Sequence, residues 1–222
     1  MRAEVTLNVM QMGLLLGRPR GTLGRKSKYW FKEFYNLLFG DLVNRDKLFL
    51  WGTETLNLTE GKMTEYIIRE IHTSDFKQVV EVYNSNQKFL LNHLGLEFID
   101  EDFISKEVST MSNVGFRSCV IVNSENQTVQ GVLDYKTDKE IYLSLLMLSA
   151  DLHGKGIGRD IYSFFESKML QAESTSIRLD VVNDYQENVV PFWKSLGFLE
   201  YESITLDWGN KKSNAVVMRK NI

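Results

Sequence analysis

A glycine-rich turn after a long apolar run places the tightest limit on what this chain can fold into. Residues 140–148 form a near-continuous apolar run, typical of a strand covered on both faces of a sheet. Gly154, Gly156 and Gly158 follow, and residues 156–170 then show apolar side chains at helical spacing. Each glycine in a helix costs about 1 kcal/mol relative to Ala. The pattern therefore predicts a buried strand and a helix whose first turn lies close to a ligand.

A pyrophosphate fits such a turn, because a helix start carries about half a positive charge and glycines let backbone N–H groups approach an anion. Two common nucleotide-binding loops are excluded. No glycine here is followed by Lys and Ser or Thr at the P-loop spacing, and Arg159 stands where a Rossmann fingerprint needs its third glycine. A glycine turn without any ligand is the alternative.

The remaining patterns predict an α/β fold with a mixed sheet. Residues 118–122 and 129–135 should form an antiparallel hairpin, whereas residues 140–148 and 177–182 should be parallel strands joined by the helix. We expect residues 90–96 to be a loop-like link, and Gly209-Asn210 to form the last turn. The other expected strands are 66–71, 198–208 and 215–219, and the other expected helices begin near residues 76, 100 and 188.

The balance of charged residues changes from basic to acidic near Met63. Residues 1–62 contain ten Lys and Arg against six Asp and Glu, which leaves sixteen against twenty-three for residues 63–222. We expect 1–62 to be an amino-terminal extension that is disordered, partly helical or not native, and 63–222 to be one domain. For the basic segment, a solvated stretch is favoured over nucleic-acid binding.

Translation starting at Met63 is one hypothesis for this division. Glu60-Gly61 must be encoded by a purine-rich run resembling a bacterial ribosome-binding sequence, and a strand pattern begins directly after Met63. An intact mass of the endogenous protein distinguishes this hypothesis from a full-length product.

Residue usage excludes several other classes of protein. Cys119 is the sole cysteine, so an internal disulfide and a cysteine-rich zinc site are impossible and a cytoplasmic location is expected. We interpret Cys119 as a small buried apolar residue. His72 and His93 lack metal-ligand spacing and are interpreted as surface or loop histidines, so no metal is expected. No window is apolar enough to span a membrane.

Two motifs together resemble the GNAT family of N-acetyltransferases. The stretch His153-Gly154-Lys155-Gly156-Ile157-Gly158 is similar to the family's cofactor motif, with His in place of the usual Gln or Arg. Residues 188–198, which end in Trp193-Lys194-Ser195-Leu196-Gly197-Phe198, are similar to its second conserved motif. The resemblance implies a mostly antiparallel sheet with two parallel central strands that splay apart, flanked by helices, and acetyl-CoA as co-substrate. The cofactor-binding residues that it implies are Leu146, Met147, Leu148, His153, Gly154, Lys155, Gly156, Ile157, Gly158 and Arg159.

The sequence departs from the family where a tyrosine usually protonates the CoA thiolate. Trp193 occupies that position, and an indole N–H is no general acid at neutral pH. Tyr162, Tyr185 or water are the alternatives for this proton. We select Tyr185 as the catalytic candidate.

The general base is also open. Glu140, Ser144 and Asp134 lie on two neighbouring expected strands, and Asp180 either faces outward or borders the cleft. We select Glu140 as the second catalytic candidate.

The leading functional hypothesis is transfer of an acetyl group to an amine of a small molecule or peptide. The acidic balance of residues 63–222 favours a cationic acceptor. A non-catalytic acyl-CoA-binding regulatory module is the alternative, and a DNA-binding role for residues 1–62 is a third reading. The expected assembly is a monomer or homodimer, without a membrane partner.

Overall fold

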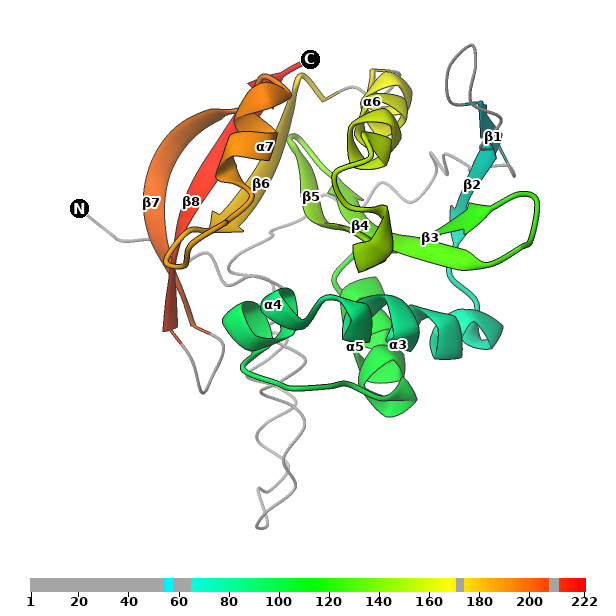
Figure 1. Ribbon diagram of the computed structural model, residues 1–222. Coiled ribbons are helices and arrows are strands. Elements are labelled where there is room, and N and C mark those ends of the chain that lie inside the picture. The colour runs from blue at the N-terminus through cyan, green and yellow to red at the C-terminus, as the bar shows by residue number, and fades with distance from the viewer. Residues whose placement is uncertain (1–53, 58–64, 171–173, 208–211) are drawn as a thin grey trace, which may run out of the picture.

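The computed structural model describes residues 54–57, 65–170, 174–207 and 212–222. The described strands form one mixed sheet with the order β1-β2-β3-β4-β5-β6-β8-β7 (Figure 1). All neighbours are antiparallel except β5 and β6. The strands are β1 (Glu54–Asn57), β2 (Glu65–Glu70), β3 (Arg117–Asn123), β4 (Val129–Thr137), β5 (Ile141–Leu148), β6 (Ser176–Val182), β7 (Leu199–Asp207) and β8 (Lys212–Asn221).

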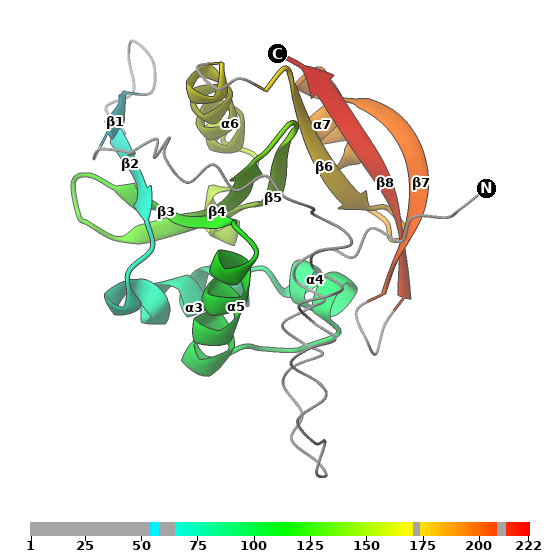
Figure 2. The same ribbon diagram turned by 180° about the vertical axis from the view of Figure 1, so that it is seen from behind.

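Helices cover both faces of this sheet (Figures 1 and 2). On one face, α6 (Ile157–Met169) and α7 (Val190–Ser195) bury Ile161, Phe165 and Trp193 against the strands. On the other face, α3 (Phe76–Ser85), α4 (Gln87–Phe89) and α5 (Glu101–Asn113) pack over a second core. The two cores meet the same central strands from opposite sides, so β4 and β5 are buried as the apolar run predicts.

The parallel strands β5 and β6 are paired only at one end. Ile141 pairs with Ile177 and Tyr142 pairs with Arg178, and the pairing between the two strands ends at this second pair. The connection through α6 confirms the predicted parallel βαβ unit. Beyond Tyr142 the two strands separate, as the family resemblance implies for the centre of the sheet.

A β-bulge lies where β5 begins to leave β6. Tyr135 of β4 is paired with Leu143 and Asp134 with Leu145, so Ser144 is an extra residue without a partner on β4. The bulge changes the alternation of the strand: Leu143 packs in the core beside α6, whereas Leu145 packs in the core beside α3. Backbone hydrogen bonding and side-chain direction are thus both redirected at Ser144.

A buried group of side chains joins the strands at their last paired position. Tyr142 Oη donates to Asp180 Oδ2 at 3.0 Å, across from β5 to β6. Arg178 Nε donates to Asp180 Oδ1 at 3.0 Å, and the Asp180 side chain is 0 % exposed. Because this carboxylate is both hydrogen-bonded and charge-compensated, the group fixes the point from which the strands diverge.

The predicted loop at residues 90–96 is helical, and that expectation was wrong. After α4, residues Leu90–Leu94 form η2, a π-helical segment, and Gly95 ends it with a φ of 65°. Leu90 and Leu94 are buried on one side of the segment. Packing of these leucines against the second core outweighs the short length and the glycine on which the loop assignment relied.

The other expected elements from residue 66 onward are present, with boundaries shifted by a few residues. Asp100 accepts a hydrogen bond from the Phe103 N–H at 2.9 Å, as expected for the N-cap of α5. β7 and β8 are antiparallel, whereas the predicted Gly209-Asn210 turn lies outside the described residues. Within the part of the chain that the structure describes, no helix is long and apolar enough to cross a membrane.

The segment before Met63 contributes β1, which pairs antiparallel with β2 at the edge of the sheet. The rest of the predicted 1–62 extension lies outside the described residues. Its separate character and a translation start at Met63 therefore stay predictions.

Two acidic side chains are buried between α5 and β4. Burial and the nearby charge of Asp134 raise the pKa of Glu107 to about 8, while burial raises the pKa of Asp134 to about 7. The Glu107 Oε1 atom has no hydrogen-bond partner among the described residues. Below about pH 7 both side chains are therefore mostly protonated.

These raised pKa values predict that stability falls as pH rises. Below about pH 4 both carboxyls are protonated in the folded and unfolded states. Stability then falls as pH rises towards the folded pKa values of about 7 and 8, because over this range the unfolded state loses these protons and the folded state keeps them. Glu107→Gln should weaken this dependence and raise the unfolding free energy at pH 8 by on the order of 2 kcal/mol. Urea unfolding at pH 5 and pH 8 measures it. Exposed Glu97→Gln is the control, and an equal pH dependence in wild type and Glu107→Gln contradicts the prediction.

Candidate functional site

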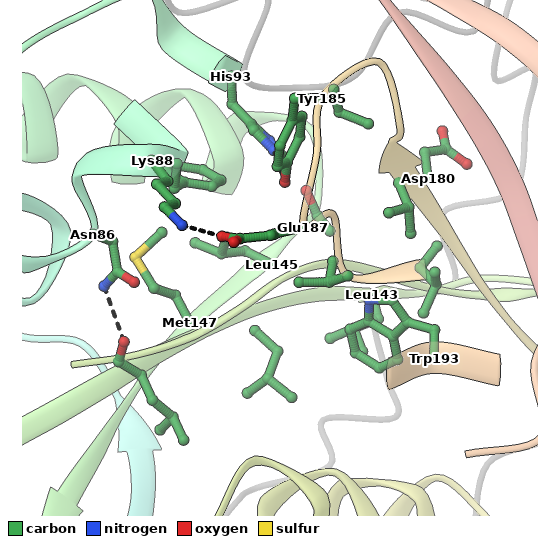
Figure 3. Close-up of a pocket in the computed structure, with 18 of the residues that line it drawn as sticks. Asn86, Lys88, His93, Leu143, Leu145, Met147, Asp180, Tyr185, Glu187 and Trp193 are labelled. Carbon is green, nitrogen blue, oxygen red and sulfur yellow. Dashed lines mark hydrogen bonds and ion pairs between the residues drawn. The ribbon is translucent and has the colours of Figure 1, made fainter. Parts of the chain in front are cut away.

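A cavity of about 300 Å³ occupies the space where β5 and β6 separate (Figure 3). Residues 143–148 of β5 and 179–182 of β6 line it, so its walls are the two strand edges beyond their last paired residues. Backbone groups on these edges are not used by β5–β6 pairing. The cavity therefore offers an extended ligand a row of backbone donors and acceptors.

Side chains from both faces of the sheet reach this cavity. Trp193 of α7 lies on one side of the β5 ribbon, whereas Lys88 and His93 lie on the other (Figure 3). Tyr185 and Glu187, from the segment between β6 and α7, face Lys88 and His93. Two ligands could thus approach one another through the sheet from opposite faces.

The glycine turn after β5 has the conformation that its composition predicts. Gly154 and Gly156 have φ angles of 73° and 87°, where a side chain is strained, and a Cβ added at either would meet no atom within 4 Å. Gly156 is the N-cap of α6, and its backbone, which carries no side chain, adjoins the positive end of that helix. The turn is accordingly open and suited to an anion.

The end of β5 is held by two side chains. The Leu148 carbonyl accepts a hydrogen bond from Asn86 Nδ2 at 2.9 Å and lies 3.1 Å from His153 Nε2. Asn86 joins α3 to the strand, and His153 begins the glycine turn. Both also line the cavity, so the turn and the cavity are one continuous site.

Part of the predicted cofactor set lies on the cavity wall. Leu146, Met147, Leu148 and His153 line it. The remaining residues continue from His153 into the first turn of α6, where Arg159 donates to Ser195 Oγ of α7 at 2.9 Å. They are Gly154, Lys155, Gly156, Ile157, Gly158 and Arg159.

Glu140, one of the two catalytic candidates, does not line the cavity. It precedes β5 at the end where β5 and β6 are paired. Its Oε1 accepts hydrogen bonds from Arg219 Nε at 2.9 Å and from Ser176 Oγ at 3.2 Å. The apolar run predicts Glu140 as the first residue of the strand, but β5 begins at Ile141 and the strands diverge at the opposite end. This position, outside the cavity, does not support Glu140 as the general base.

Tyr185, the other catalytic candidate, lines the cavity and is paired with His93. The Tyr185 Oη and His93 Nε2 atoms are 3.2 Å apart, and the ring of His93 packs on Phe89 with centroids 4.4 Å apart. Burial, together with the charge of Asp184, raises the pKa of Tyr185. The interpretation of His93 as a surface or loop histidine was wrong, because His93 lies half-buried in η2 and contacts Tyr185. Its partner lies ninety-two residues away, and no local pattern indicates that contact.

Lys88 and Glu187 form an ion pair across the cavity mouth (Figure 3). Their side chains are 75 % and 71 % exposed, and the hydrogen bond from Lys88 lowers the pKa of Glu187. Glu187 has a φ of 60°, a conformation uncommon for a residue other than glycine. Sequence reasoning missed both residues, since each lies in a connecting segment without a motif.

Three other residues considered for catalysis in the sequence analysis line the cavity. Ser144 lines it and its buried Oγ has no hydrogen-bond partner among the described residues. Asp180 also lines it, but its carboxylate is occupied by Arg178 and Tyr142. Trp193 packs edge-to-face on Tyr162 and Phe198 while one part reaches the cavity.

The remaining candidates lie away from the cavity. Tyr162 is buried beneath α7 and donates to Glu166 Oε1 at 3.2 Å. Asp134 is buried beside α5, and Cys119 is 1 % exposed, in keeping with its interpretation as a core residue. Over the described ranges, no three His, Cys, Asp or Glu side chains gather where they could hold a metal ion.

Solved structures of acetyltransferases share this fold. An acetyltransferase from Thermus thermophilus is 15 % identical, with a TM-score of 0.59, over 71 % of this chain and 97 % of that chain. The spermidine N-acetyltransferase of Vibrio cholerae, solved with CoA and spermine, is 12 % identical, with a TM-score of 0.56, over 70 % and 94 % of the two chains. Ribosomal-protein-alanine N-acetyltransferase from Brucella melitensis is 16 % identical, with a TM-score of 0.53, over 70 % and 99 %.

Sequence comparison supports the same relationship. No curated protein sequence matches the chain significantly. The sequence model described as the acetyltransferase (GNAT) domain does match, over residues 79–220, which include the divergent strands, the glycine turn and α7. Because this match covers more than half of the chain, the protein belongs to the GNAT acetyltransferase family.

Proposed function

We propose that this protein transfers the acetyl group of acetyl-CoA directly to a primary amine of a small molecule or peptide. One observation carries the proposal: a single cavity runs between the separated strands β5 and β6, reaches side chains on both faces of the sheet and adjoins the open glycine turn. A thioester and an amine approaching from opposite faces would meet inside the sheet. Holding two reactants in this way supplies the proximity on which direct transfer depends.

The donor would bind along β5 and at the start of α6. Backbone groups of Leu146, Met147 and Leu148 would pair with the pantetheine arm, as a missing neighbour strand would. N–H groups of the turn from His153 to Arg159 would hold the pyrophosphate, helped by the positive helix end. The open space above Gly154 and Gly156 supports this placement.

The acceptor would bind on the opposite face, between Lys88, His93, Tyr185 and Glu187. The Glu187 carboxylate beside aromatic rings suits an ammonium group, which would compete with Lys88 for this carboxylate. Two of the structures that share the fold are named for amine acceptors, spermidine and the alanine of a ribosomal protein. These neighbours support an amine but do not identify the one that this protein uses.

The chemistry needs proton handling, not a covalent enzyme intermediate. A neutral amine attacks the thioester carbonyl, and a backbone N–H of the bulged strand β5 stabilises the oxyanion that forms. CoA then leaves as the thiolate. Trp193 has no acidic proton to offer at neutral pH. Ser144 and Tyr185 both line the cavity with a hydroxyl, and we assign proton transfer at the reaction centre to Tyr185, because its Oη lies 3.2 Å from His93 Nε2.

Turnover separates this proposal from a non-catalytic acyl-CoA-binding module. Incubation with acetyl-CoA and a panel of primary amines should release free CoA thiol, detected colorimetrically, and give acetylated amine by mass spectrometry. Tyr185→Phe should lower kcat by about 100-fold, typical of a lost proton-transfer group. Tight binding of acetyl-CoA without thiol release across the whole panel favours the module instead.

The glycine turn predicts a specific effect on CoA affinity. Gly156→Ala should place a methyl group in the open space and raise the Kd for CoA about tenfold in calorimetry, equivalent to about 1.4 kcal/mol. Gly95→Ala is a matched control, because Gly95 is also left-handed, with a φ of 65°, and an added Cβ there would meet nothing. Both variants should lose similar stability from backbone strain. Equal CoA affinity in the two variants argues against a ligand at the turn.

The negative charge of Glu187 at the cavity predicts how tightly a cationic acceptor binds. Glu187→Gln removes the negative charge at the cavity mouth, so the KM for a cationic amine should rise several-fold while kcat stays within twofold. Glu200→Gln is the matched control, since Glu200 pairs with Lys194 in another exposed ion pair that does not line the cavity. Steady-state kinetics at low ionic strength gives both constants. A KM that is unchanged in Glu187→Gln contradicts this role.

A further inference from the structure

The proton that the acceptor amine loses has no evident destination in the proposed function. An amine arrives as an ammonium ion at neutral pH and must lose one proton before its lone pair can attack. Tyr185 has a hydroxyl on the acceptor side, but burial raises its pKa, so a phenolate is not available as the base at neutral pH. Another group must therefore take up the proton.

The carboxylates around Tyr185 are already engaged. Glu187 is paired with Lys88, and Asp180 is held by Arg178 and Tyr142. Asp184, next in the chain to Tyr185, accepts a hydrogen bond from the backbone N–H of Asn214 at 2.9 Å. Glu140 lies outside the cavity, bound to Arg219.

His93 is in the right place to receive this proton. Its Nε2 atom lies 3.2 Å from Tyr185 Oη, and both residues line the cavity on the acceptor side (Figure 3). The imidazole is held between rings: Phe89 packs on it at 4.4 Å and Tyr185 meets it edge-on at 5.7 Å, with 67° between the planes. The segment η2, which contains His93, ends at Gly95, whose backbone has the left-handed conformation. Histidine is also the side chain that ordinarily exchanges protons between pH 5 and pH 8.

We propose that His93 is a positioning residue that orients the Tyr185 hydroxyl and takes up the acceptor proton through it. The ammonium gives a proton to Tyr185 Oη while the Tyr185 hydroxyl proton moves to His93 Nε2, so Tyr185 stays neutral throughout. The imidazolium then releases this proton to solvent. The amine nitrogen forms a bond to the thioester carbon, the carbon–sulfur bond breaks, and the second nitrogen proton ends on the CoA sulfur. Ammonium and acetyl-CoA thus give amide, CoA thiol and one released proton.

This inference rests on the proposed acetyl transfer and makes a separate prediction about pH. His93→Phe keeps an aromatic ring against Phe89 but has no acceptor for the Tyr185 proton. His93→Gln keeps a group that can hydrogen-bond Tyr185 but cannot carry the proton. We expect kcat to fall about 100-fold in both variants, with KM within threefold in His93→Gln. The acidic limb of the wild-type kcat profile between pH 5 and pH 8 should disappear in both.

His72→Gln is the control, because His72 is exposed and does not line the cavity. It should keep the wild-type kcat and pH profile. If His93→Gln and His93→Phe retain kcat within twofold and the acidic limb, the inference is overturned while Tyr185 and the proposed function stand. Loss of activity in His93→Phe with full recovery in His93→Gln also overturns it, since orientation alone would then suffice.

An NMR measurement that needs no turnover tests the His93–Tyr185 pair separately from acetyl transfer. The sequence has three histidines, so their imidazole signals can be assigned in NMR spectra by single substitutions. Tyr185→Phe should shift the His93 signals between pH 5 and pH 8 and leave those of His72 unchanged. Unchanged His93 signals show that the pair does not form and overturn the inference even in an active enzyme. Absence of turnover with every amine in the wild type counts against the proposed function itself.

Discussion

The limited pairing of β5 with β6 is the constraint on which the rest of the site depends. The strands are joined up to Tyr142 and Arg178, where the buried Asp180 carboxylate binds side chains from both. Immediately beyond, the bulge at Ser144 reverses which face each β5 side chain meets. A buried ionic group on one side of the divergence and a bulge on the other thus keep a gap in an otherwise continuous sheet. The chain leaves backbone hydrogen bonds unmade there, which a ligand can complete.

This gap gives the two faces of the sheet different roles in our account. The face with α6 and α7 supplies the glycine turn and Trp193, and we place the donor there. The face with α3, α4 and η2 supplies Lys88, His93 and their partners Glu187 and Tyr185. Since Trp193 from one face and Lys88, His93, Glu187 and Tyr185 from the other line the same cavity, reacting groups would meet inside the sheet.

Local sequence signals predicted the parts of the site that depend on local chain geometry. Gly154 and Gly156 are left-handed because a strand must turn sharply into α6, and their spacing shows this directly. Contacts between distant segments were not predictable in this way: His93 meets Tyr185 only because η2 packs beside the end of β6. Glu140 lies just before β5, at the end where β5 and β6 are paired, and a strand pattern does not tell at which end two parallel strands separate. The helical turns after α3 were missed because buried leucines, not capping residues, define them.

A crystal structure of the protein with bound CoA tests the central claim most directly. The account predicts that the pyrophosphate lies on the N–H groups of the turn that contains Gly154 and Gly156, and that the pantetheine arm follows β5. The thiol should then lie between β5 and β6, with Trp193 on one side and Tyr185 on the other. A CoA molecule bound elsewhere, or a thiol outside the gap between β5 and β6, would contradict the account.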